Sequence, residues 1–282
     1  MDKTGTLLGF LFGSIFILLG ILWPSNWSNL ALILEENESL AELEALINLT
    51  RFVDVKSFFI VFGGTLSTVF IAFPIKRTLR SFKSIPKVFS SDTIDTEAQS
   101  IFEQSKKVAE KRFQGKRISS DDLNSITNPI MRRWIEALIV REQVSEEILE
   151  EVIESEIRMY DRQAEEEIEV IEFMSMTAPA FGMMGTVIGL VLMLAETGSI
   201  RSVMQAMSVA MITTLYGVIL ANLVFQPLAS KRKQLKDSHL VIMEMISTCV
   251  KSIAKRESPY TLLQELALYL PEKRLDFDHQ YR

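Results

Sequence analysis

The chain has 282 residues, 48% of them hydrophobic, with a formal net charge of −6 at pH 7 and one cysteine. The acidic balance gives no indication of a nucleic-acid partner, and the lone Cys249 excludes an intramolecular disulfide or a cysteine-based metal site. His239 and His279 are equally isolated, and the sequence shows no catalytic triad, phosphate-binding glycine loop or paired carboxylates, so neither an enzyme nor a resident metal or cofactor is expected.

The first predicted element is an apolar segment at residues 7–23, LLGFLFGSIFILLGILW. A hydrocarbon core of roughly 30 Å is crossed by about 20 apolar residues in a helix, so this segment is long enough to span a bilayer. The preceding MDKTGT is barely basic, and no small-x-small cleavage site lies before the polar stretch that follows Trp23. We therefore predict a retained transmembrane span within residues 1–23 rather than a cleaved secretory signal.

An acidic segment, residues 24–57, separates this span from a second apolar segment at residues 58–74, FFIVFGGTLSTVFIAFP. Glycine and hydroxyl residues dilute the second segment, but its length and apolar content still predict a span. Within the acidic segment, the stretch from Leu40 to Leu49 is amphipathic.

Residues 75–172 form a long polar insertion in which apolar periodicity predicts three helices, at residues 98–112, 130–141 and 145–171. Asn128 and Pro129 mark the turn before the second of them. The third is expected to continue into the next apolar segment, where Pro179 could kink it. A charged stretch after the first helix, RFQGKRISSDDL, is by itself typical of an ordinary solvated surface.

Two further apolar segments, residues 173–194 and 203–227, are joined by a short connection at residues 195–202 and followed by a polar region at residues 228–282. Between Phe173 and Leu194, and between Val203 and Phe225, the sequence contains no Lys, Arg, Asp or Glu. It carries glycines and hydroxyls instead. Small residues let membrane helices approach closely, and a hydroxyl can bond its own backbone or coordinate a partly dehydrated ion.

Two sets of residues follow as candidates. Close helix packing is expected at four glycines, namely Gly182, Gly185, Gly189 and Gly217. Helix packing and ion contact are both open for three threonines, namely Thr186, Thr213 and Thr214.

The basic residues near the span ends predict the orientation of the chain, because Lys and Arg resist translocation. Lys76 and Arg77 follow the second span, and Lys231 and Arg232 follow the fourth, so both of these ends should be cytoplasmic. The predicted fold is an all-α integral membrane protein with four transmembrane helices and a large helical cytoplasmic domain between the second and third. Both termini are expected in the cytoplasm.

Five stretches of the chain carry a family resemblance. The first resembles a second span with its basic exit and reads FFIVFGGTLSTVFIAFPIKRTLRSFK. The next resembles a cytoplasmic helical region and reads NPIMRRWIEALIVREQVSEEILEEVIESEI. APAFGMMGTVIGLVLML and AMSVAMITTLYGVILANLVFQPLASK resemble paired third and fourth spans, and SPYTLLQELALYLPEKR a C-terminal end. The family is that of the MotA/PomA flagellar stator subunits. PAFGMMGTVIGL followed by TTLYG at this separation is a specific signature of it, and the resemblance covers most of the chain.

The resemblance implies a stator subunit of the bacterial flagellar motor in the inner membrane, serving motility and chemotaxis. Family members form a pentamer around a dimer of a MotB/PomB-type partner, whose single transmembrane helix carries an essential aspartate. Ion flow through such a complex drives rotation against a rotor switch-complex protein of the FliG type, and membrane lipid is the other expected partner. The four predicted spans contain no carboxylate, so the titratable group has to come from the partner.

Individual residues carry over from the family pattern. Pro179 matches the family proline that opens the third span and is implicated in coupling ion passage to movement. Thr186 matches a position that is threonine in sodium-type members and typically alanine in proton-type ones, and Thr213 and Thr214 match the TT of the sodium-type TTLYG. Sodium is a hard cation that prefers oxygen ligands. Sodium is therefore favoured as the transported ion, with a proton-driven stator as the alternative.

Two regions depart from the family pattern. Where members often show a basic pair followed by a LALEE-like stretch, this chain has RFQGKRISSDDL, which keeps the charge order but not the motif. The candidates for rotor contact are therefore Arg112, Lys116, Arg117, Asp121 and Asp122. Residues 24–54 are longer than a family loop, and Leu40 to Leu49 is a candidate to cover the outer mouth or to touch the partner.

Three other functions stay open on the sequence. A TolQ/ExbB-like energiser of outer-membrane processes is expected to have three spans. A stand-alone transporter or channel would conduct ions as a single component, against which the lack of an internal carboxylate argues. A structural membrane scaffold would be indifferent to substitutions at Thr186 and Thr214.

Overall fold

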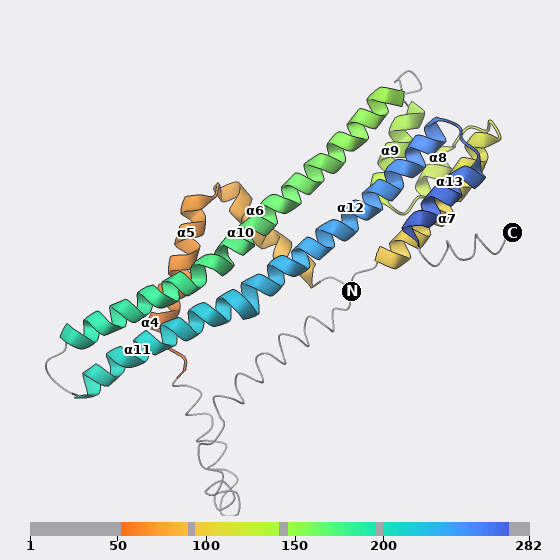
Figure 1. The fold of residues 1–282 in the computed structure, drawn as a ribbon. Coiled ribbons are helices and arrows are strands. Elements are labelled where there is room, and N and C mark those ends of the chain that lie inside the picture. Colours follow the sequence, from red (N-terminus) through yellow and green to blue (C-terminus); the bar gives the residue numbers. More distant parts are fainter. Residues whose placement is uncertain (1–51, 90–93, 141–145, 196–199, 271–282) are drawn as a thin grey trace, which may run out of the picture. The chain divides into compact units, whose positions relative to one another are not determined.

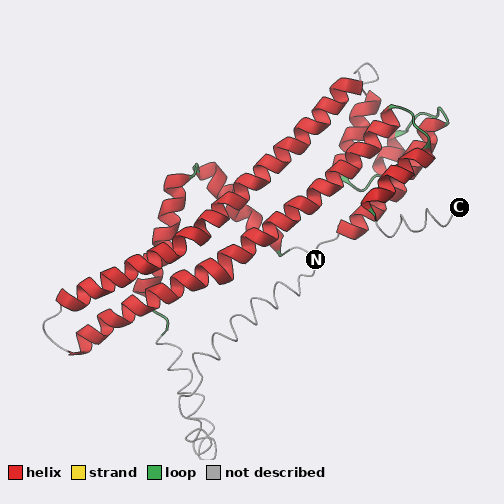
Figure 2. Ribbon diagram, viewed as in Figure 1, coloured by secondary structure: helices red, strands yellow, loops and turns green. Residues whose placement is uncertain are grey.

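The computed structural model describes residues 52–89, 94–140, 146–195 and 200–270. Within these residues every regular element is a helix (Figure 1, Figure 2). They divide into two compact units, one from residues up to 90 together with 166–232, the other from residues 91–165 together with those from 233 onward. The predicted first span at residues 7–23 and the amphipathic stretch from Leu40 to Leu49 lie outside the described residues.

Three helices in the described part of the chain are long and apolar enough to cross a membrane, namely Val55–Ala72, Glu147–Ala195 and Ile200–Ala254. Together they make the chain a helical, multi-pass membrane protein. They contain the second, third and fourth apolar segments predicted from the sequence.

The second apolar segment forms α4 (Val55–Phe58), η1 (Phe59–Gly63, a π-helical turn) and α5 (Gly64–Ala72). It begins at residue 55 rather than the predicted 58, because the Asp54 side chain caps the helix by accepting a hydrogen bond of 2.8 Å from the Ser57 amide. It ends where Phe73 adopts an extended backbone, the conformation favoured before a proline such as Pro74.

The third and fourth apolar segments belong to long helices. The expectation that the helix beginning after Ser145 continues into the third segment is confirmed, since α10 runs unbroken over Glu146–Ala195 with Pro179 inside it. The fourth lies in α11 (Ile200–Ile219), η2 (Leu220–Phe225) and α12 (Gln226–Ala254). The turns of η2 widen to a π-helix directly before Pro227, which has no N–H to continue the α-helical bonding pattern.

Helix α6 (Ile75–Val88) follows the second apolar segment and was not predicted. It packs against α10 through two of its side chains: Ser81 Oγ donates to the Glu167 carbonyl at 2.7 Å, and Arg77 Nε donates to the Glu166 carbonyl at 3.0 Å. This helix therefore belongs to the same unit as the apolar segments.

The other unit is a helical domain with its own apolar core. It contains α7 (Ile94–Phe113), α8 (Ser120–Asn124), α9 (Pro129–Val140), α13 (Pro259–Leu266) and the 3₁₀ turn η3 (Ala267–Tyr269), together with the N-terminal part of α10 and the C-terminal part of α12. Its fully buried side chains include Ile101, Met131, Ile153, Ile246 and Leu262. The helices predicted at residues 98–112, 130–141 and 145–171 are confirmed as α7, α9 and the first part of α10, whereas the short α8 was not predicted.

Two polar residues of this domain illustrate how the sequence determines its local structure. Asn128 caps α9, its Oδ1 accepting hydrogen bonds from the amides of Ile130 at 2.8 Å and Met131 at 3.0 Å.

Cys249 is fully buried in the core, and burial raises the pKa of its thiol to about 12. The thiol therefore stays protonated and acts as a small apolar side chain.

Candidate functional site

Helices α10 and α11 meet along a seam of small residues. On each helix these residues recur at steps of four, three and four positions, which places them in one stripe: Ala178, Gly182, Gly185 and Gly189 on α10, and Ala206, Ala210, Thr213 and Gly217 on α11. All of them are buried. A Cβ added at Gly217 would lie 2.8 Å from the Ala178 carbonyl oxygen, and one added at Gly185 would lie 2.4 Å from Thr213 Cβ. The two backbones therefore approach more closely than larger side chains would allow.

An open groove of about 840 Å³ lies beside this seam, between α10 and α11. Its walls are apolar, with Leu190 and Met193 from α10 and Met207, Met211 and Val218 from α11. Two hydroxyl side chains also line it, Thr186 from α10 and Thr214 from α11. The structure thus brings together two of the three threonines that the sequence singled out, one from each helix.

The two groove threonines differ in how their hydroxyls are bonded. Thr186 Oγ1 donates to the Met183 carbonyl on its own helix at 2.6 Å, which leaves its oxygen lone pairs free to accept or to coordinate. Thr214 is exposed, and its hydroxyl has no hydrogen-bond partner within the described part of the chain. Two oxygens are too few for a dehydrated cation, so a complete coordination shell would need ligands from water or from another chain.

Thr213 and Pro179 lie in the seam rather than on the groove. The Thr213 side chain is fully buried, and its Oγ1 donates to the Ala210 carbonyl at 2.9 Å. Pro179 lies opposite Gly217, with its Cα 3.2 Å from the position of a Cβ added there. A proline at this point removes one backbone hydrogen bond from α10 at a place where the two backbones lie close together.

A further polar group, which sequence reasoning missed, lies at the start of α4. Tyr216, from the TTLYG motif on α11, accepts a hydrogen bond from the Asp54 amide at 3.0 Å and donates to the Phe52 carbonyl at 2.6 Å. The Asp54 carboxylate also accepts a bond from the Ser57 hydroxyl. The spacing of Asp54 and Ser57, a helix-capping pattern, could have indicated the start of α4, but no signal in the sequence indicates the contact with Tyr216.

Replacing Tyr216 by phenylalanine is expected to lower the stability of the protein, because two hydrogen bonds between the chain before α4 and α11 are lost together. At about 0.5 to 1.5 kcal/mol for each bond, the free energy of unfolding should fall by roughly 1 to 3 kcal/mol. Thermal unfolding of the purified protein in detergent measures the change. Tyr269→Phe is the matched control, because the Tyr269 hydroxyl lies at 3.3 Å from a single partner, Thr248 Oγ1; equal losses in the two variants would contradict the role assigned to Tyr216.

The five rotor-contact candidates lie close together in the helical domain. Arg112 is in the last turn of α7, Lys116 and Arg117 are in the loop that follows, and Asp121 and Asp122 are in the first turn of α8. Gly115 ends α7 with a φ of +73°, a conformation that residues with a side chain rarely adopt. Lys116, Arg117 and Asp121 are exposed, whereas Arg112 and Asp122 are half-buried.

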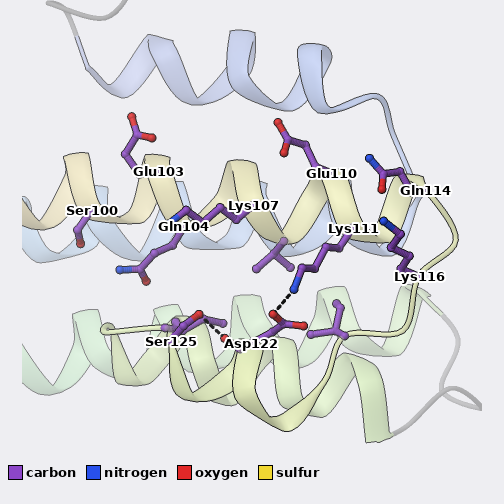
Figure 3. Close-up of a pocket in the computed structure, with 13 residues that line it drawn as sticks. Ser100, Glu103, Gln104, Lys107, Glu110, Lys111, Gln114, Lys116, Asp122 and Ser125 are labelled. Atoms are coloured by element: carbon purple, nitrogen blue, oxygen red, sulfur yellow. Dashed lines mark hydrogen bonds and ion pairs between the residues drawn. The ribbon is translucent and has the colours of Figure 1, made fainter.

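A cavity of about 570 Å³ in this region is lined by both Lys116 and Asp122 (Figure 3). Lys111, which the sequence reasoning did not single out, points at Asp122 and forms an ion pair with it. This ammonium, together with the amide and hydroxyl of Ser119, lowers the pKa of Asp122 from 3.8 to about 2. Because the folded pKa lies below the unfolded one, the pair stabilises the fold above about pH 4 and loses that effect as the pH falls toward 2. At neutral pH the carboxylate is therefore charged.

Comparison with known proteins identifies similar sequences over most of the chain. Residues 122–245 match the model of the MotA/TolQ/ExbB proton channel family. The chain is 31% identical over 226 residues to motility protein A of Aquifex aeolicus, which covers 79% of this chain and 87% of that protein. It is 28% identical over 221 residues to chemotaxis protein PomA of Vibrio alginolyticus, covering 78% of this chain and 85% of that protein.

A solved structure has the same fold. The match is to a chain of the flagellar MotAB stator complex from Bacillus subtilis, with a TM-score of 0.76 over 98% of this chain and 99% of that chain, at 19% sequence identity.

Proposed function

This chain belongs to the MotA/TolQ/ExbB proton channel family, and on that premise we propose that it is the MotA-type subunit of a bacterial flagellar stator, which couples inward flow of sodium ions to torque. The family is one of membrane channel proteins rather than enzymes. The similarity to motility protein A and to PomA directs the proposal to the flagellar branch of the family.

The observation that carries the proposal is the groove between α10 and α11. Its lining offers two hydroxyl oxygens, from Thr186 and Thr214, and no ionisable group. Two hydroxyls alone do not stabilise an ion in an apolar groove, and the lining has no carboxylate, so we place the compensating carboxylate on another chain. A MotB/PomB-type subunit, with an aspartate on its single transmembrane helix, is the partner that fits. The pentamer of this chain around a dimer of that partner is part of the same proposal.

The same reasoning assigns roles to the remaining residues. Pro179, in the seam opposite Gly217, is proposed to couple ion passage to a movement of α10, and Thr213 to complete the ion path from within the seam. The charged residues around α8, from Arg112 to Asp122, are proposed to engage a rotor protein of the FliG type. Exposed charges of this kind set orientation and the rate of engagement more than affinity.

We propose four spans, with the first at residues 7–23, and both termini on the cytoplasmic side of the bacterial inner membrane. In this orientation residues 75–172 and 228–282 are cytoplasmic, and residues 24–57 and 195–202 face outward. Cytoplasmic placement of the Lys- and Arg-rich region after α5 follows the positive-inside rule.

The test is the swimming speed of cells that carry only this stator and its partner, as external sodium is varied at constant pH and ionic strength. Speed is expected to rise and saturate with sodium and to survive a proton uncoupler. Thr214→Val and Thr186→Val, which keep the side-chain shape but remove the hydroxyl, are expected to raise the sodium concentration for half-maximal speed. The loss of one oxygen ligand to a charge is worth about 1.5 kcal/mol or more, which corresponds to about tenfold or more.

Ser208→Ala is the matched control, because Ser208 is an exposed hydroxyl on α11 that does not line the groove. Speed that is indifferent to sodium and abolished by the uncoupler would assign the stator to protons and the threonines to packing. A complex that assembles but never supports swimming, and instead restores outer-membrane energisation, would favour a TolQ/ExbB-like role.

A further inference from the structure

Helix α6 presents three distinct faces. Its buried face carries Thr78 and Ser81, which are fully buried, and Ser84 and Val88, which are nearly so. A second face is basic and exposed, formed by Lys76, Arg80 and Lys83. A third is apolar and also exposed. Ile75 is 63% exposed and Leu79 is 51% exposed on this face. The sequence of α6, IKRTLRSFKSIPKV, contains no acidic residue.

The position of α6 along α10 is set by specific contacts. The Phe73 ring, just before α6, packs edge-to-face on Phe173 of α10 with centroids 5.3 Å apart. The Arg77 guanidinium lies over the Phe73 ring at 4.7 Å and forms an ion pair with Glu169. The bond from Ser81 to the Glu167 carbonyl holds the middle of the helix. In Figure 1, α6 accordingly crosses α10 next to the end of α5.

These contacts place the first turn of α6 at the depth of the lipid headgroups and its middle just below them. Phe173 is the last residue of the apolar stretch on this side, since the exposed Glu172 precedes it. Glu167 lies six residues farther along α10, which is about 9 Å at the helical rise of about 1.5 Å per residue. The headgroup layer extends roughly 5 to 7 Å beyond each side of the hydrocarbon core. A helix attached at this level lies in or just below that layer.

We propose that the exposed faces of α6 form a binding site for anionic phospholipid headgroups of the cytoplasmic leaflet. The apolar face, with Ile75 and Leu79, enters the boundary of the acyl chains, and Lys76, Arg80 and Lys83 bind lipid phosphates beside it. This arrangement is that of an interfacial amphipathic helix, in which apolar burial and electrostatic attraction act together. The site anchors the exit of the second span and fixes α10 relative to the membrane surface.

Charge and chain connection favour lipid as the occupant of these faces. None of the three basic side chains has an ion-pair partner among the described residues, and the helix has no carboxylate of its own to neutralise them. The helix also follows α5 after two residues, Phe73 and Pro74, so it cannot move far from the bilayer. Lipid binding does not depend on which ion is conducted, so a stator that failed the sodium test would still show it.

The test compares lipids retained by the stator complex. The complex of this chain with its partner is reconstituted into vesicles of equal phosphatidylglycerol and phosphatidylcholine, extracted in mild detergent, and its phospholipids are counted by mass spectrometry. A basic residue near an anionic surface contributes about fivefold in binding, so the wild type should prefer phosphatidylglycerol by at least about tenfold. The variant K76Q/R80Q/K83Q should lose most of this preference. In the wild type, about 1 M salt should reduce it as well, because the screening length falls to about 3 Å.

The control variant is K106Q/K107Q/K255Q, which removes the same number of exposed charges from the helical domain. It is expected to keep the wild-type preference. An unchanged preference in K76Q/R80Q/K83Q would overturn the proposal. So would dissociation of that variant into smaller oligomers in the same vesicles, since α6 would then be a contact between copies of this chain.

Discussion

Replacing Gly185 by alanine is expected to force α10 and α11 apart and to abolish swimming supported by this protein. The added methyl carbon would lie 2.4 Å from Thr213 Cβ, 2.5 Å from its Cγ2 and 2.6 Å from its Oγ1. Thr213 cannot move aside easily, because its side chain is fully buried and its hydroxyl is bonded to the Ala210 carbonyl. Overpacking of a tight contact costs about 1 to 3 kcal/mol. The groove would be distorted as well, since its walls are the same two helices.

The measurement is the yield and melting temperature of the purified complex, together with swimming in soft agar. Gly63→Ala is the matched control, because a Cβ at Gly63 meets nothing within 4 Å. The double variant G185A/T213G removes the Thr213 side chain that the added methyl group would meet, so it should recover part of the lost thermal stability, whereas swimming is not expected to return because Thr213 belongs to the proposed ion path. If G185A and G63A melted at the same temperature and supported the same swimming, the seam could not be as close as the structure shows.

The sequence predicted the apolar segments within the described residues and the main helices of the other unit. Crossing a bilayer imposes length and composition so strictly that these segments are visible without tertiary information. Helix α6 was missed although its apolar residues Ile75, Leu79 and Phe82 recur at helical spacing. Its Lys and Arg residues were interpreted only as the basic exit of the second span, where the positive-inside rule already accounts for them. The first turn of the second span was missed because Lys56 and Asp54 break the apolar run just where the helix begins.

The candidate site was predictable in part. The stripe from Gly182 to Gly189 is evident in the sequence, because its spacing can be read along one helix. Which of the adjacent Thr213 and Thr214 turns to the seam, and which to the groove, depends on how α11 is rotated against α10. The stripe of small residues on α11, from Ala206 to Gly217, indicates that Thr213 lies on a packing face, but only the structure shows that this face meets α10. The bond from Tyr216 to the Phe52 carbonyl joins residues 164 positions apart, and only the folded chain shows it.

Breaking the buried ion pair between Arg232 of α12 and Glu167 of α10 is expected to destabilise the protein strongly. Arg232 Nη2 lies 2.9 Å from Glu167 Oε2, and the two side chains are only 9% and 11% exposed. Arg232→Met leaves the carboxylate buried without its counter-ion, and Glu167→Leu does the same to the guanidinium. Removing one partner of such a pair costs about 3 to 5 kcal/mol, whereas replacing both by apolar side chains is often neutral. The double variant E167L/R232M should therefore be more stable than either single variant.

The melting temperature and swimming of these three variants are compared with those of Glu172→Gln. The comparison decides whether the Glu167–Arg232 ion pair stabilises the fold or aligns the helices. Glu172 is exposed on the same helix, so E172Q removes a carboxylate without leaving a buried charge and is expected to melt like the wild type. Ser175 Oγ donates a hydrogen bond of 2.9 Å to Gln226 Oε1, between the ion pair and the seam. Polar contacts therefore align α10 with α12 past the end of the small-residue seam. If E167L/R232M is stable but no longer supports swimming, the role of the ion pair is to fix the alignment of α10 against α12 rather than to stabilise the fold. This alignment would hold the two groove threonines opposite each other. Single variants that melt like E172Q would contradict both roles.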